Sequence, residues 1–317
     1  MTKKIAYRVR NWKDYNRSLI NRGNLTLWFS KDVIKSWYQK PQKKKQRGRS
    51  FTYSDTYVEL ALTLRTLFRL SLRATQGFLE GLVYLLGLEL QVSHYSRLSR
   101  RAPDLNIQLT RLKEEGKTPT DLVIDSTGLK IFGEGEWKMR THGKQVRRTW
   151  RKYHVSVNPS SHEVTAIELT ESNVHDCTVI QALLATQKNI GKVYADGAYP
   201  FKQSLDAIAN AGGIPIIPVR SGTSLVNKKP SRGEILRNQL ILDIRNAGSR
   251  AQWKKSSDYH RRSLVETHMF RLKAILGGSL RSRTLAAQKT EARIMANILN
   301  KMTRLGMPKS EKIDMVK

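Results

Sequence analysis

Short apolar runs in the central part of the chain predict buried β-strands. Residues 121–125 and 192–197 each form such a run, and each run carries an aspartate at or near its end, Asp125 and Asp196. Apolar runs of this length without alternation are typical of strands that are covered on both faces. Because α/β folds build their sites at strand ends, both carboxylates are candidate site residues.

The segments around these two strands predict the rest of an α/β domain. Alternating apolar and polar residues over 152–157 and 163–169, with a turn at 158–162 between them, predict a hairpin. Helices are expected over 176–187 and 201–211, and a further strand over 214–219. This order of elements predicts a mixed sheet with flanking helices.

The segment 51–102 has helical periodicity instead. One helix should begin near Ser54, and a second should cover about 73–86. A short turn then leads to a polar, basic helix that Ser93 would cap. Its candidate DNA-contacting residues are Ser93, Tyr95, Arg97 and Arg100. Helix, short turn and basic helix are the pattern of a helix-turn-helix. An ordinary helical bundle with a charged face is the alternative.

The remaining segments set the expected domain boundaries. Residues 1–50 are basic, aromatic and irregular, and we expect an arm or linker there. Its basic run at 40–49 would contact DNA phosphates or serve as a flexible connection. We expect a helical DNA-binding domain over 51–115 and a catalytic domain over 119–305. The polar stretch 221–258 would be an insertion in that domain, and 306–317 a polar tail.

Charge is the outstanding property of the composition. The chain has 317 residues, with 57 Lys and Arg against 26 Asp and Glu, which gives a net charge of +31. A surface this basic attracts polyanions, most often nucleic acid, although charge does not separate DNA from RNA partners. The one cysteine, Cys177, excludes an intrachain disulfide and a cysteine zinc cluster.

The apolar segments argue against a membrane protein. The most apolar stretch, 77–90, is interrupted by Glu80 and Glu89, and the basic start of the chain has no apolar run behind it. We therefore expect no membrane partner, and a cytoplasmic protein associated with the nucleoid.

A long helix expected from about Asp258 carries a further set of candidate residues. Tyr259, Arg262, Glu266 and Lys273 stand at offsets of 0, 3, 7 and 14. At roughly 100° per residue all four lie within about a 60° arc of one helix face. A separate apolar stripe consists of Val265, Met269, Leu272 and Leu276. An amphipathic helix with a solvated charged face is the alternative.

The chemistry of the carboxylates indicates a metal site. Asp125 and Asp196, if brought together, would repel each other unless a cation neutralised them. With oxygen ligands that cation is Mg²⁺ or Mn²⁺. Two ions about 4 Å apart would activate a water or a 3′-hydroxyl and stabilise the leaving oxygen of a phosphodiester. Glu266 would complete the ligand set.

Three motifs together resemble a known family. Tyr259-x₂-Arg262-x₃-Glu266-x₆-Lys273 is similar to the signature of DDE transposases of bacterial insertion sequences, in the IS-four/IS-five superfamily. The text around it, from Trp253 to Glu266, is closest to the IS-five group. Segments 124–127 and 194–199 resemble the first and second acidic motifs. The resemblance covers residues 51–299.

The resemblance implies an RNase H-like catalytic core in which Asp125, Asp196 and Glu266 bind metal. It also implies that Tyr259, Arg262 and Lys273 contact DNA near the transposon end. A transposase would bind the terminal inverted repeats, cleave the DNA there and join the 3′-hydroxyl to target DNA. Processing two ends needs two sites, so we expect a homodimer or a higher oligomer on double-stranded DNA.

Two functional alternatives stay open at this point. One is a nuclease with the same core that cuts DNA without strand transfer. The other is a non-enzymatic DNA- or RNA-binding regulator, although three retained carboxylates argue against it. Trp253 has two possible roles, stacking on a DNA base or packing of the insertion.

Overall fold

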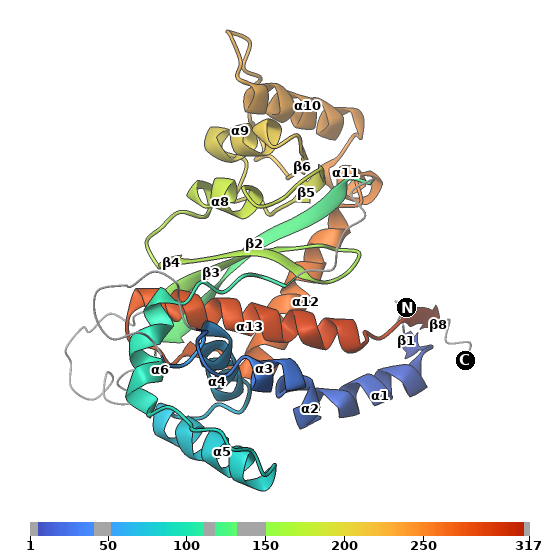
Figure 1. The fold of residues 1–317 in the computed structure, drawn as a ribbon. Helices are drawn as coiled ribbons and strands as arrows, with labels where there is room; N and C mark the ends of the chain where they lie inside the picture. The colour runs from blue at the N-terminus through green and yellow to red at the C-terminus, as the bar shows by residue number, and fades with distance from the viewer. Residues whose placement is uncertain (1–5, 41–51, 111–117, 132–149, 314–317) are drawn as a thin grey trace, which may run out of the picture. The chain divides into compact units, whose positions relative to one another are not determined.

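The computed structural model describes residues 6–40, 52–110, 118–131 and 150–313, and residues 41–49 of the predicted basic linker lie outside these ranges (Figure 1). By its internal contacts the chain divides into two compact units. The first comprises residues 1–101 and 298–317, and the second residues 102–297. Within the described residues, no helix combines the length and the apolar composition that crossing a membrane needs.

The first unit contains more regular structure than the sequence pattern predicts. Its elements are β1 (Ala6–Val9), α1 (Trp12–Arg22), α2 (Leu25–Trp28), α3 (Lys31–Lys35), α4 (Asp55–Leu67), α5 (Leu72–Leu85), α6 (Tyr95–Arg101) and β8 (Ser310–Ile313). The prediction of an irregular segment was therefore wrong for residues 6–40. The aromatic residues there serve as core, with Trp28 and Trp37 buried, while the cations between them keep their charged ends in water. β1 pairs with β8, in the predicted tail.

The helices of the predicted DNA-binding segment form where expected, with one change. Ser54 caps α4 by accepting a hydrogen bond from the Tyr57 amide. Ser93 does not cap α6, which begins at Tyr95. It is buried, and it is hydrogen-bonded to the Tyr57 hydroxyl through both its amide, at 2.8 Å, and its side chain, at 3.1 Å. Ser93 thus ties the segment before α6 to α4 instead of presenting its hydroxyl to solvent.

The second unit is an α/β domain with a mixed sheet. Its main elements are β2 (Thr120–Ile131), β3 (Trp150–Val157), β4 (Val164–Glu171), α8 (Ile180–Leu184), β5 (Ile190–Tyr194), α9 (Lys202–Asn210), β6 (Ile214–Ile216), α10 (Arg232–Asn246), α11 (Arg250–Ser256), α12 (Ser263–Arg271), β7 (Ser279–Leu280) and α13 (Leu285–Leu305, which continues into the first unit). Short 3₁₀ turns cover Ala102–Asp104 and Asp176–Thr178.

The strand order of this sheet is β4-β3-β2-β5-β6, with β7 beside the far end of β2. The first three strands of the unit are antiparallel, whereas β5 and β6 run parallel to β2. A central first strand between an antiparallel meander and parallel strands is the RNase H-like arrangement. The expected fold class is therefore confirmed.

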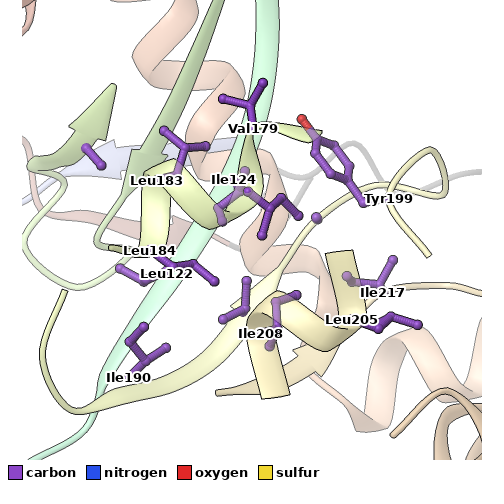
Figure 2. Close-up of a cluster of buried hydrophobic side chains, with 14 residues drawn as sticks. Leu122, Ile124, Val179, Leu183, Leu184, Ile190, Tyr199, Leu205, Ile208 and Ile217 are labelled. Carbon is purple, nitrogen blue, oxygen red and sulfur yellow. The ribbon is translucent and has the colours of Figure 1, made fainter. Parts of the chain in front are cut away.

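Helices cover both faces of the sheet. On one face, Leu122 and Ile124 of β2 pack against apolar residues of α8 and α9 in a buried cluster (Figure 2). On the other face, α12 contacts β2 and β3. Side chains alternate along a strand, so the odd-numbered residues of β2, Asp125 among them, belong to the α12 face.

Several expected elements differ in extent from the structure, among them the helix expected over 176–187 and the strand expected over 214–219, which are both shorter. Two others carry candidate site residues. β2 continues six residues past Asp125 to Ile131, because Ser126–Lys130 keep pairing with β3. The long helix expected from Asp258 is instead three consecutive segments, a 3₁₀ helix (Tyr259–Arg262), α12 and a π-helix (Leu272–Leu276). Asp258 precedes them with a left-handed φ of 58°. The predicted insertion 221–258 contains α10 and α11.

A close approach of α10 to α9 depends on a glycine. A Cβ added at Gly233 would meet the backbone nitrogen of Asp206 at 2.3 Å. We predict that Gly233→Ala lowers the free energy of unfolding by about 2 kcal/mol, because the two helices must separate. The exposed Gly81 in α5 has no atom within 4 Å of an added Cβ, so Gly81→Ala should raise that free energy by about 0.5–1 kcal/mol. Native-state hydrogen exchange of each unit measures both changes, and equal signs would contradict the prediction.

Candidate active site

Asp125 occupies the middle of the sheet, where β2 loses its parallel partner. The last paired residues of β2 and β5 are Val123 and Tyr194, and Asp125 follows two positions later. Its Oδ1 accepts a hydrogen bond from the Ser126 amide at 2.8 Å. The side chain is mostly buried, with 17% exposed. The sequence pattern predicted that the strand ends at Asp125, whereas β2 continues beyond it to Ile131.

Asp196 lies two residues beyond the end of β5, as expected for a strand-end carboxylate. Its Oδ1 accepts a hydrogen bond from the Ala198 amide at 2.8 Å, which fixes the side chain over a tight turn. Its negative charge raises the pKa of Asp125. The two aspartates therefore share one electrostatic environment.

Arg262 joins the third carboxylate to the first. Its Nη1 lies 3.3 Å from Asp125 Oδ2, and its Nη2 donates to Glu266 Oε1 one helical turn later. The Arg262 side chain is 23% exposed and that of Glu266 is 54% exposed. The start of α12 is thus held against β2 by a cation between two carboxylates, and Glu266 faces the open side of that contact.

Burial is the main cause of an elevated pKa at Asp125, which rises to about 6. The Ser126 amide opposes this rise, Asp196 adds to it, Arg262 lowers it again and Glu266 raises it. A carboxyl group with two acidic neighbours and one basic neighbour binds a proton or a cation more readily than an isolated one. The site therefore has a local excess of negative charge in a protein of net charge +31.

Lys273 also faces β2. Its Nζ donates to Thr127 Oγ1 at 2.7 Å, and Thr127 lies on the same face of β2 as Asp125. Lys273 is the second residue of the π-helix and is exposed. Arg262, Glu266 and Lys273 are therefore brought together along one side of β2, as the helical spacing predicts.

Unlike Glu266 and Lys273, Tyr259 is buried. It lies in the 3₁₀ segment, where each residue turns about 120° instead of 100°, and its side chain is 8% exposed. The ring contacts the Trp253 ring at 5.9 Å between centroids, and Lys254 lies over it at 5.2 Å. Trp253 is 3% exposed, which favours packing over stacking on a base. Burial raises the pKa of Tyr259, so its hydroxyl stays protonated at neutral pH.

The predicted contact residues of α6 differ in accessibility. Arg97 and Arg100 are exposed and Tyr95 is partly exposed. The Arg73 guanidinium lies over the Tyr95 ring at 4.8 Å and also donates to its hydroxyl at 3.1 Å. Ser93, in contrast, is buried. The polar face of α6 therefore consists mainly of its arginines.

The donor chemistry of the three carboxylates fits a hard divalent cation, and Arg262 supplies positive charge between two of them. In the described part of the chain, however, no three His, Cys, Asp or Glu side chains stand close enough together to hold a metal ion. The present side-chain arrangement therefore pairs Asp125 and Glu266 with an arginine.

Several residues around this site carry no signal in the helical or strand pattern of the sequence. Tyr199 is buried, and burial together with the charges of Asp176, Asp125 and Asp196 raises its pKa (Figure 2). Its position within the second acidic motif was a signal that could have identified it. Arg261, the neighbour of Arg262, donates to Asp121 Oδ2 at 2.8 Å. Asp121 is thus committed to an ion pair at the start of β2.

Comparison with known proteins gives two family matches. A family model described as a transposase DDE domain matches residues 116–301, and a second model with the same description matches residues 20–134. The chain is also similar to a solved structure, the Drosophila P element transposase strand transfer complex. The identity is 9%, the match covers 92% of this chain and 85% of that chain, and the TM-score is 0.30. A similarity this low supports no inference about this chain.

We predict that Asp125→Asn stabilises the metal-free protein in alkaline solution. Folded Asp125 keeps its proton up to about pH 6, whereas the unfolded chain loses it near pH 3.9. Ionisation of Asp125 therefore lowers the free energy of unfolding above about pH 6. This loss disappears as the pH falls from about 6 to about 3.9. At pH 8 the substitution should raise the free energy of unfolding by about 1–2 kcal/mol, a value that is reduced because the side chain is partly solvated. Urea unfolding with a chelator at pH 8 and pH 4 measures it, and an equal gain at both values would contradict ionisation of the buried carboxyl as the cause.

Proposed function

Because the chain belongs to the DDE transposase family, an enzyme family of DNA transposition that cleaves DNA and transfers strands, we propose that Asp125, Asp196 and Glu266 are its metal ligands. The observation that carries this proposal is the Arg262 contact, since it brings Glu266 of α12 to the same side of β2 as Asp125. The influence of Asp196 and Glu266 on the pKa of Asp125 supports a common site.

Enzymes of this family use divalent metal ions. For this chain we propose Mg²⁺, or Mn²⁺ in its place, and two ions in the complete site. When bound, they supply Lewis-acid activation of a water or a 3′-hydroxyl and stabilise the leaving oxygen. Asp125, held by the Ser126 amide, and Asp196, held by the Ala198 amide, keep their oxygens oriented with little freedom. Glu266, which is more exposed, lies on the side of the site that solvent can reach.

Arg262 and Lys273 are proposed to hold DNA phosphates next to the scissile bond. Lys273 is exposed, and its bond to Thr127 directs the ammonium group toward the face of β2 that carries Asp125. Guanidinium and ammonium groups bind phosphate oxygens through charge-assisted hydrogen bonds. The buried Tyr259 is proposed to act indirectly, by supporting the backbone that leads to Arg262.

Recognition of the terminal inverted repeat is proposed for the first unit, with Arg97 and Arg100 of α6 as its main contacts and Tyr95 beside them. Both arginines are exposed on a helix that follows a second helix and a turn, which is the arrangement that helix-turn-helix domains use in the major groove. A homodimer or higher oligomer on DNA is proposed, because two transposon ends need two active sites.

The proposed metal ligands can be tested by neutralising each carboxylate. Asp125→Asn, Asp196→Asn and Glu266→Gln should each lower cleavage of an end-containing duplex in Mg²⁺ at least about 1,000-fold, because each removes an anionic ligand. DNA affinity, measured by gel shift, should be retained. Asp243→Asn, a change of the same kind on α10 at a residue that contacts Gln239, is the control and should cut normally. Full cleavage by any of the three variants would remove that residue from the site.

The effect of Arg262 on metal affinity can be distinguished from that of its neighbour Arg261. Arg262→Gln removes the cation that neutralises Asp125 and Glu266, so the DNA-free protein should bind Mn²⁺ about five-fold to ten-fold more tightly. Arg261→Gln removes an adjacent cation that pairs with Asp121 instead, and Mn²⁺ affinity should stay unchanged. The electron paramagnetic resonance signal of free Mn²⁺ measures both affinities. Equal affinities of the wild-type and Arg262→Gln proteins would contradict the neutralising role.

A further inference from the structure

An exposed aromatic ring lies on the helix that carries Glu266. Phe270 is 72% exposed, although phenylalanine is a residue type that folding normally encloses. The packing face of the same helix is occupied by other residues, Val265, His268 and Leu272, which are all buried. The ring is therefore not needed for packing of α12 against the sheet. A single exposed apolar residue is common on protein surfaces, so the case for a role depends on what surrounds the ring.

The neighbours of Phe270 on the helix surface are the proposed catalytic and phosphate-binding groups. Glu266 precedes it by four residues within α12, so the two side chains lie about 40° apart on adjacent turns. Lys273 follows it by three residues, and its Nζ bonds to Thr127 of β2. The ring thus stands between a carboxylate and an ammonium group on the exposed face of the helix.

The character of this surface discriminates between possible occupants. Phe270 is the only large apolar side chain that is markedly exposed in the described segment 259–280. An interface with a second copy of the chain would require a contiguous apolar patch. A flat ring beside the Lys273 ammonium group instead matches a nucleic acid strand, whose phosphates pair with a cation and whose bases stack on aromatic faces.

We propose that Phe270 stacks on a base of the DNA end next to the cleavage point, and thereby holds that end unpaired in the active site. The inference rests on the proposed function of Asp125, Asp196 and Glu266. A base that leaves its stack exposes both apolar faces to water, and a ring one helical turn from Glu266 provides a surface for one of them. Stacking tolerates any base, so Phe270 would assist strand opening without selecting sequence.

Photochemical cross-linking tests this contact without requiring cleavage. The probe is a duplex of the element's terminal repeat, with 5-iodouracil at thymines of the last base pairs and Ca²⁺ in place of Mg²⁺. We expect a cross-link at Phe270, mapped by mass spectrometry, and its loss in Phe270→Ala. Efficient cross-links that map only to other residues would overturn the proposal.

Cleavage rates provide the second test. Phe270→Ala should cut the paired duplex about ten-fold more slowly, and should recover to near the wild-type rate on a duplex with two mismatched pairs at the cut. Phe270→Trp should retain activity, whereas Phe270→Leu, apolar but not flat, should behave like the alanine variant. A wild-type rate for Phe270→Ala on paired DNA, or equal slowing on both duplexes, would contradict the stacking role.

Two controls separate this proposal from others. Thermal unfolding of each variant should match that of the wild type, since the ring is exposed, and light scattering should give the same mass for the DNA-free proteins. A lower mass for Phe270→Ala would assign the ring to an interface between copies and overturn the proposal. If wild-type protein cuts neither duplex while the cross-link to Phe270 persists, the catalytic proposal fails and the DNA contact stands.

Discussion

Repulsion between like charges is the constraint on which the site depends. Burial raises the free energy of ionised Asp125 the most, and the negative charges of Asp196 and Glu266 add to that cost. A cation must offset it. In the DNA-free protein Arg262 does so for two of the three carboxylates. The same electrostatic demand would attract divalent ions, so the features that make the site costly to fold also favour the proposed metal binding.

The sheet supplies the geometry that makes this cluster possible. Alternation along β2 turns Leu122 and Ile124 into the core beneath α8 and α9, and turns Asp125 and Thr127 toward α12. One strand thus contributes both to a buried cluster and to the face that carries Asp125. On β3, Tyr153 lies opposite Thr127 and stacks on His268, whose pKa burial lowers to about 3. This neutral, buried pair holds α12 on the sheet, so Glu266 is positioned by packing as well as by Arg262.

The sequence predicted the parts of the fold that depend on local pattern. Apolar runs and alternation located the strands, and the placement of Asp196 followed from a strand that ends beside it. Other features depend on contacts that no local pattern contains. Because cations surround Trp28 and Trp37 in the sequence, the pattern did not indicate that these aromatic residues form a core. Asp125 was expected at a strand end because the residues after it, Ser126–Gly128, are polar or small and do not look like a strand. They nevertheless pair with β3.

The helix of Glu266 shows most clearly where such prediction stops. A helical wheel assumes a constant turn per residue, and here the backbone passes from 3₁₀ through α to π within eighteen residues, Tyr259–Leu276. The assumption holds for Arg262, Glu266 and Lys273, which lie in or next to α12, and it fails for Tyr259 one turn earlier. Tighter winding turns that ring inward against Trp253. Looser winding follows at Leu272, where Lys273 reaches Thr127. Departures from regular helix on both sides of Glu266 therefore give each side chain a different environment, and this is how one short helix both packs on the sheet and leaves Glu266 and Lys273 exposed.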